Sequence, residues 1–182
     1  SRRNTSIAVR SHDGAVAPKA IWLDIDIKSP PKGYTTLEEA MDALITFVSV
    51  AGLPAPSAAV KSGGGLHVYW ISDRSLTIAE WRPFAEGLKS EAMRLGLRAD
   101  YGVTADPARI LRFPGTFNRK IAGNPRPVKV LGLGCDYNFA TDLANLKLIG
   151  APLVTATVTK SAPFDLSAFA NFKVDPALAA SV

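Results

Sequence analysis

The sequence predicts a single α/β domain over residues 1–150, in which strands and helices alternate along the chain. The chain has 182 residues, of which 47% are hydrophobic and 20% charged, a composition typical of a globular protein with one buried core. Short apolar runs favour strands, and longer segments with apolar residues three and four positions apart favour amphipathic helices. Residues 151–182 are rich in small and hydroxyl residues with few charges, which predicts a linker or a partly ordered tail.

The first half of the domain predicts a strand, a helix and a hairpin. An apolar run favours a strand near 19–28, and a helix over 36–51 follows it. A threonine opens this helix with a glutamate three residues on, which is the pattern of a capping box. Two short strands, near 57–61 and 66–72, are joined by a glycine-rich turn, as in a β-hairpin.

The second half predicts one long helix followed by shorter elements. The long helix covers 78–95 and begins with another capping-box pattern. A short strand that reaches Asp100 and a brief helix over 105–112 are expected next. A strand at 128–131 and a short helix at 141–146 complete the predicted domain.

Positive charge is concentrated in one part of the chain. The formal net charge is +5, and residues 98–129 contain seven basic and two acidic side chains, so this segment alone carries the whole excess. A basic surface of this kind indicates an anionic partner such as nucleic-acid phosphates.

Other features of the composition exclude some classes of protein. The single cysteine, Cys135, rules out an internal disulfide and fits a reducing cytoplasm, and with only two histidines in the chain no zinc site is expected. No apolar run reaches membrane-spanning length and the N-terminus has no signal-peptide pattern, so we expect a cytoplasmic protein with no membrane partner.

Two aspartates one residue apart lie in the first predicted strand. Side chains two positions apart share a face, so Asp24 and Asp26 point one way while Leu23 and Ile25 point into a core. Two carboxylates side by side on a sheet repel each other and are costly to desolvate, and a divalent cation removes that penalty. A pair of cations is a usual device for nucleotidyl transfer. A strand with two solvated aspartates is the alternative for this motif alone.

The glycine-rich turn is a second motif. Ser62, Gly63 and Gly64 allow backbone N–H groups to come close to an anion. If alternate residues of the return strand are core, His67 faces the same side as the two aspartates, where its imidazole would donate to a phosphate oxygen. An ordinary hairpin loop is the alternative.

A third motif begins at the next carboxylate. Asp100, at the end of a predicted strand, is placed to supply a third carboxylate to the metal pair. Arg109 and Arg112 lie three apart on a predicted helical turn and so face the same way, and arginine forks suit phosphate oxygens. A Pro-Gly-Thr turn would then return Asn118 and Lys120 to the site. A salt-bridged loop is the alternative for each residue taken singly.

Together the three motifs resemble the archaeo-eukaryotic primase superfamily, in the primase-polymerase form found in phages, plasmids and other mobile elements. The resemblance covers roughly residues 1–130 and rests on the order and spacing of an Asp-x-Asp strand, a Ser-Gly-x-Gly-x-His hairpin, a further aspartate and a basic segment. The matching residues are Asp24, Asp26, Ser62, Gly63, Gly65, His67, Asp100, Val103, Thr104, Asp106, Arg109, Arg112, Pro114, Gly115, Thr116, Asn118 and Lys120.

The resemblance implies an RRM-like mixed or antiparallel catalytic sheet flanked by helices, with an additional N-terminal α/β unit. It implies template-dependent nucleotidyl transfer with two divalent ions, Mg²⁺ or Mn²⁺, held by Asp24, Asp26 and Asp100. The partners would be a single-stranded DNA template, a primer strand and an NTP or dNTP, with a helicase or another domain following the C-terminal tail. The nucleotide would contact Ser62, Gly63, Gly64, His67, Arg109, Arg112, Asn118 and Lys120.

Five further residues are weaker candidates. Asp106 would touch a metal ion or orient an arginine, and Arg3 and Asn4 would reach the nucleotide because related chains often begin with a similar stretch. Tyr101 or Tyr69 would exclude a 2′-hydroxyl and so select deoxynucleotides.

Other classes of function make different demands on the sequence. A replication-initiation or single-strand-binding module with the same fold would lack catalysis, and it gains nothing from three carboxylates that face anionic DNA. A metal-dependent nuclease has no need of a triphosphate pocket. Toprim-type enzymes place a glutamate on an earlier strand, and no glutamate precedes Asp24. Polymerase-β-like enzymes place a Gly-Ser helix start before the aspartates, and this chain has none there.

Overall fold

The fold is that of a computed structural model, which describes residues 17–149. The predicted tail at 151–182 and the candidate residues Arg3 and Asn4 lie outside this range.

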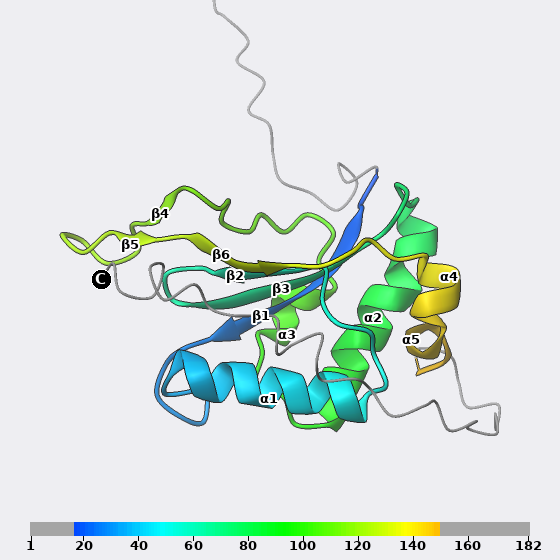
Figure 1. Ribbon diagram of the computed structural model, residues 1–182, viewed down its shortest axis with the longest axis horizontal. Helices are drawn as coiled ribbons and strands as arrows, with labels where there is room; N and C mark the ends of the chain where they lie inside the picture. The colour runs from blue at the N-terminus through cyan, green and yellow to red at the C-terminus, as the bar shows by residue number, and fades with distance from the viewer. Residues whose placement is uncertain (1–16, 150–182) are drawn as a thin grey trace, which may run out of the picture.

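A four-stranded sheet in the order β1-β3-β2-β6 forms the centre of the fold (Figure 1). Its strands are β1 (Ala20–Asp26), β2 (Ala58–Lys61), β3 (Gly65–Ile71) and β6 (Lys129–Leu133), and every neighbouring pair is antiparallel. Because β3 lies between β1 and β2 and runs opposite to both, β1 and β2 are parallel. They are joined through helix α1 (Leu37–Val50), which is a split β-α-β arrangement.

The helices cover one face of this sheet. Ile21, Leu23 and Ile25 of β1 are fully buried and share one cluster with side chains of α1 and of α2 (Ile78–Arg94). Burial of each such side chain contributes about 1.5–3 kcal/mol. The intervening residues of β1, including Asp24 and Asp26, therefore point to the opposite face, as the alternation along the strand predicts.

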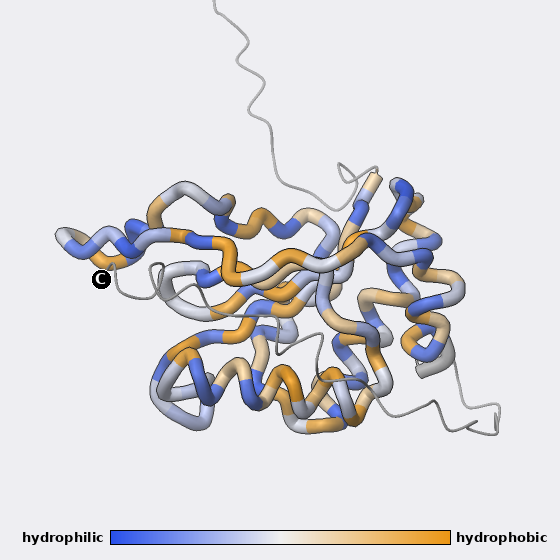
Figure 2. Tube along the Cα trace, viewed as in Figure 1, coloured by the Kyte–Doolittle hydropathy of each residue, from blue (hydrophilic) through white to orange (hydrophobic). Residues whose placement is uncertain are grey.

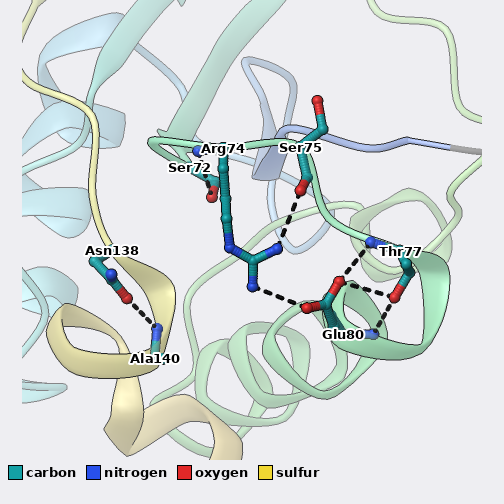
Figure 3. A network of polar contacts seen from close by, with 7 residues as sticks. All are labelled: Ser72, Arg74, Ser75, Thr77, Glu80, Asn138 and Ala140. Carbon is teal, nitrogen blue, oxygen red and sulfur yellow. Dashed lines mark hydrogen bonds and ion pairs between the residues drawn. The ribbon is translucent and has the colours of Figure 1, made fainter.

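The predicted starts of the two long helices are confirmed. The Thr77 hydroxyl accepts from the Glu80 backbone N–H and the Glu80 carboxylate accepts from the Thr77 N–H, so the capping box of α2 is complete (Figure 3). Arg74 Nη2 lies 2.8 Å from Glu80 Oε1, and this bond together with the Thr77 donors lowers the pKa of Glu80 to about 2. At α1 the capping residue is Thr36, whose side chain accepts from the Glu39 N–H.

The segment after α2 differs from its prediction. Asp100 does not end a strand: it caps α3 (Tyr101–Thr104), and its carboxylate accepts from the Gly102 N–H at 3.1 Å. Residues 105–112 form turns and chain without regular secondary structure where a helix is predicted. The Asp106 carboxylate accepts from the Ala108 N–H at 3.0 Å, and this local bond offers the backbone an alternative to helical bonding.

Two further differences concern the last part of the domain. A two-stranded hairpin of β4 (Phe117–Asn118) and β5 (Arg126–Pro127) lies above the sheet in Figure 1, on the side opposite α1. No strand was predicted there. The single short helix predicted at 141–146 is instead two helices, α4 (Phe139–Asp142) and α5 (Ala144–Ile149). Between residues 17 and 149, no helix has the length and apolar character needed to cross a membrane.

Candidate active site

The pairing of β1 with β3 sets Asp24 opposite His67. These two residues are Cα partners in the register, so both side chains emerge on the face of the sheet away from α1. Asp24 Oδ1 lies 3.7 Å from His67 Nε2, and His67 is only 1% exposed. The face shared by the aspartates and the histidine, predicted from alternation alone, is therefore present.

A backbone hydrogen bond holds Asp100 beside Asp24. β1 is an edge strand, and the Asp24 carbonyl on its free side accepts from the Asp100 N–H at 2.7 Å. Burial, then the Asp26 and Asp100 carboxylates, raise the pKa of Asp24 to about 6. Arg109 and Arg112 act in the opposite direction on the same group. The carboxylates of Asp26, on the same strand, and of Asp100, from a distant part of the chain, thus both act on Asp24.

The donor chemistry of this acidic group suits a hard divalent cation, because carboxylate oxygens are the ligands that Mg²⁺ and Mn²⁺ prefer. The arrangement itself is not a coordination sphere: within residues 17–149, no group of three or more His, Cys, Asp or Glu side chains is positioned to hold a metal ion. Instead the Lys28 ammonium pairs with Asp26, and this hydrogen bond raises the pKa of Lys28. A positive charge therefore already neutralises one of the three carboxylates.

An open hollow adjoins these carboxylates. It has a volume of about 580 Å³ and its lining includes Asp26, Lys28, Asp100 and Arg98. The hollow leaves room for a substrate group beside the acidic cluster.

His67 is held in one protonation state. Burial, followed by the Arg112 and Arg109 charges, lowers the pKa of His67 to about 4, so the imidazole is neutral near pH 7. The Tyr69 hydroxyl lies 3.3 Å from His67 Nδ1, and burial together with Asp24 raises the pKa of Tyr69 to about 12. The protonated Tyr69 hydroxyl can donate to Nδ1, which leaves the proton of the neutral ring on Nε2.

The glycine turn packs tightly against the β4–β5 hairpin. Gly63 has a φ of 72°, which favours glycine, and a Cβ there would lie 2.9 Å from Asn118 Cβ. A Cβ on Gly64 would lie 3.2 Å from Asn118 Nδ2. The buried Asn118 amide also donates to the Ser62 carbonyl at 3.2 Å. Four of the predicted nucleotide contacts, Ser62, Gly63, Gly64 and Asn118, are therefore neighbours in space.

Arg126 belongs to this site and was not predicted as a site residue. Its register partner across the hairpin is Asn118, and Arg126 Nη2 lies 3.5 Å from the place of a Gly64 Cβ. The sequence does contain a signal for it. Gly123-Asn124-Pro125 favours a turn and so indicates a hairpin in this segment, but the turn alone does not give the register that pairs Arg126 with Asn118.

Three buried side-chain nitrogens on this face have no hydrogen-bond partner. Among the residues that the structure describes, these atoms are His67 Nε2, Arg109 Nε and Arg126 Nε. A buried donor without a partner costs about 1–3 kcal/mol, or more when the group is charged. Arg109 is close enough to lower the pKa of His67, and Arg126 lies over the turn that precedes the His67 strand. The three donors therefore outline an incomplete site that an anion would satisfy.

The remaining candidates lie further from this cluster or have another contact. Arg112 is exposed, although its charge acts on His67 and Asp24 as that of Arg109 does. Lys120 is also exposed, and its backbone N–H donates to the Asn118 side chain at 3.0 Å. The Tyr101 hydroxyl donates to the carbonyl of Leu97, which lies three residues beyond the last residue of α2. The Asp106 carboxylate closes the local turn described above.

Comparison with known proteins supports the fold. No family model matches the sequence, and no curated protein matches it. A solved structure, the AEP domain of the primase-polymerase (PrimPol) of cyanophage S-2L, is similar, with a TM-score of 0.53 and 17% sequence identity. The match covers 75% of this chain, and the chain spans 64% of that one. Both therefore share a mixed α/β fold in which helices flank an antiparallel sheet.

Proposed function

We propose that this domain is a template-dependent nucleotidyltransferase of the primase-polymerase type, which joins nucleoside triphosphates on a single-stranded DNA template. One observation carries the proposal. The unsatisfied donors of His67, Arg109 and Arg126 lie beside a coupled cluster of three carboxylates. Nucleotidyl transfer needs both groups. Hydrogen-bond donors must hold the triphosphate, and carboxylates must hold the cations that neutralise charge on the reacting phosphate. The similarity to a primase-polymerase domain favours the same reaction class.

The nucleotide triphosphate would occupy the glycine turn and the donors around it. The neutral His67 ring would donate from Nε2 to a phosphate oxygen, with Tyr69 holding Nδ1 as the acceptor. Arg109 and Arg126 would supply charge-assisted hydrogen bonds to the same group. Because these donors are already in place, little reorganisation would accompany binding.

Asp24, Asp26 and Asp100 would hold divalent cations, Mg²⁺ or Mn²⁺. When bound, these ions would neutralise charge on the reacting phosphates and lower the pKa of the attacking hydroxyl. The Lys28 ammonium would leave Asp26 as a cation binds, since both neutralise the same carboxylate.

Primer extension by a variant with both Asp24→Ala and Asp26→Ala tests the proposal. A labelled primer on a template, with nucleotides and Mg²⁺ or Mn²⁺, should be extended by the parent and not detectably by the variant. Asp42→Ala, an exposed aspartate on α1, is the matched control and should keep full activity. Extension by the double variant at the parental rate would show that the acidic residues are wrongly assigned.

The triphosphate contacts have a separate test. Arg126→Ala and His67→Gln should each raise the KM for the nucleotide about 10-fold or more, with a smaller effect on kcat, because a buried charge-assisted bond contributes about 1.5–3 kcal/mol. Arg82→Ala on the exposed side of α2 is the control. An unchanged KM for Arg126→Ala would show that Arg126 does not contact the nucleotide.

A binding module with the same fold is the alternative function. It predicts that the parent protein binds single-stranded DNA and yields no product with any combination of ribo- or deoxynucleotides and cation. New short products on an unprimed template would establish priming, and extension only of an added primer would restrict the role to polymerisation.

A further inference from the structure

Exposed hydrophobic side chains are concentrated in residues 109–126, which we call the arm. In the described part of the chain, four of the seven large hydrophobic residues that are exposed lie in it. They are Ile110, Phe113, Phe117 and Ile121, with exposed fractions of 78%, 76%, 52% and 48%. A monomeric surface rarely gathers such side chains without a partner.

The charge of the arm indicates the nature of that partner. No aspartate or glutamate lies between Asp106 and Asp136, whereas five basic residues lie within the arm itself. Figure 2 shows hydrophobic and hydrophilic residues interleaved along this segment, above the sheet. The Arg119 guanidinium lies 5.9 Å from the centre of the Phe117 ring, so a cation and an aromatic face are already combined. Alternating rings and cations suit a ligand that is both planar and anionic.

The arm is attached to the candidate active site. Asn118, within the arm, donates to the Ser62 carbonyl, and Arg126, at its end, lies over Gly64. An extended ligand bound along the arm would therefore lead towards the glycine turn and the carboxylates of β1.

We propose that the arm binds single-stranded DNA, with bases stacked on Phe113 and Phe117 and phosphates contacted by exposed cations such as Arg119 and Lys120. Base stacking on aromatic side chains is tolerant of sequence and contributes about 1–3 kcal/mol per base. A duplex hides the faces of its bases, so the rings select the single strand. That this strand is the template rests on the proposed function. The excess of cations favours a nucleic acid over an apolar protein partner.

Binding of short labelled oligonucleotides, followed by fluorescence anisotropy in EDTA without nucleotides, tests the proposal. Phe113→Ala and Phe117→Ala should each weaken binding of oligothymidylate about 10-fold, in line with the loss of one stacked base. The same variants should bind an abasic oligomer as the parent does, since that ligand keeps its phosphates and lacks bases. Phe113→Tyr and Phe117→Tyr should restore the affinity.

Exposed apolar residues elsewhere supply the matched controls. Val50→Ala and Leu133→Ala remove side chains of 61% and 74% exposure outside the arm and should leave the affinity unchanged. All variants should keep the parental Tm, because the removed side chains are exposed.

Three results would overturn the proposal. In the first, oligothymidylate binds equally well to the parent and to both Phe→Ala variants. In the second, the Phe→Ala substitutions weaken binding of the abasic oligomer by the same factor as binding of oligothymidylate. In the third, light scattering shows a parental dimer that the Phe→Ala variants convert to a monomer, which would assign the surface to a second copy of the chain.

The test also separates this inference from the proposed reaction. If the protein extends primers but its binding of oligothymidylate does not depend on Phe113 and Phe117, only the proposed role of the arm is refuted. A protein with Phe-dependent binding and no nucleotidyl transfer would refute only the enzymatic proposal.

Discussion

Asp24 and His67 lie 3.7 Å apart, yet they do not form an ordinary ion pair. The pKa of Asp24 is raised to about 6 and that of His67 is lowered to about 4, in each case mainly by burial. Each side chain is therefore biased towards its neutral form. Without a cation or an anion in place, the site holds groups whose charges are costly, which is typical of a site built for a charged ligand.

The Asp24 carboxylate should reduce the stability of the cation-free protein at neutral pH. Its folded pKa, about 6, lies above the ordinary value of 3.8, so the folded state binds the proton more tightly. This unfavourable contribution is full above about pH 6 and is lost as the pH falls towards 4. Asp24→Asn should therefore raise the free energy of unfolding by about 2 kcal/mol at about pH 8, and by little near pH 4.

Urea denaturation in EDTA at several pH values measures this effect. Asp73→Asn, which changes an exposed aspartate, is the control and should have no comparable pH-dependent effect. A variant with Asp24→Asn that is no more stable than the parent at high pH would show that the carboxylate is well solvated.

At the scale of elements, close approach between β1 and the glycine turn determines the site. A Cβ on Gly65 would clash with the Ile25 carbonyl oxygen and would lie 3.0 Å from Asp26 Cα. The lack of a side chain at Gly65 thus lets β3 begin directly beside the end of β1. The backbone N–H of Ile27 also donates to the Gly64 carbonyl at 3.0 Å, which ties the turn to the aspartate strand.

Gly65→Ala should destabilise the protein by about 2–3 kcal/mol, since the new methyl group meets backbone atoms that cannot rotate away. Gly96→Ala is the matched control: it has a φ of 71° but nothing within 4 Å of the new Cβ, so it carries only backbone strain of about 1 kcal/mol. Thermal or urea unfolding of both variants measures the difference. Equal losses of stability would show that the contact between Gly65 and β1 leaves room for a methyl group.

For the molecule as a whole, one hydrophobic cluster joins the sheet, α1, α2 and the last helices. It extends from Ile21 of β1 to Leu146 of α5, and it includes all three tryptophans, Trp22, Trp70 and Trp81. Elements far apart in the chain therefore depend on the same core, and we expect them to unfold together.

The loss of tryptophan fluorescence and of far-UV circular dichroism should consequently have the same urea midpoint. Leu44→Ala, at a fully buried position of α1, should lower the free energy of unfolding by about 2–5 kcal/mol and should shift both midpoints equally. The exposed Met93→Ala is the control. Separate midpoints for the two probes would contradict a single cooperative core.

Most of the fold, and part of the site, followed from local patterns. Alternation along β1 predicted that Asp24 and Asp26 share a face away from the core, and the threonine–glutamate spacing predicted where α1 and α2 begin. These features depend on residues two to four positions apart, whose relative directions are set by strand or helix geometry. The amino-acid sequence alone therefore determined the four strands of the main sheet, the two long helices and the position of His67 on the aspartate face.

Contacts between distant segments were decided only in the tertiary structure. The helix predicted at 105–112 is absent because a local carboxylate bond forms turns there, and Arg126 reaches Gly64 through a hairpin that short periodic patterns do not reveal. Asp100 likewise joins Asp24 through a single backbone bond at the free edge of β1. Such contacts depend on how separate elements pack in three dimensions, so no spacing along the chain encodes them directly.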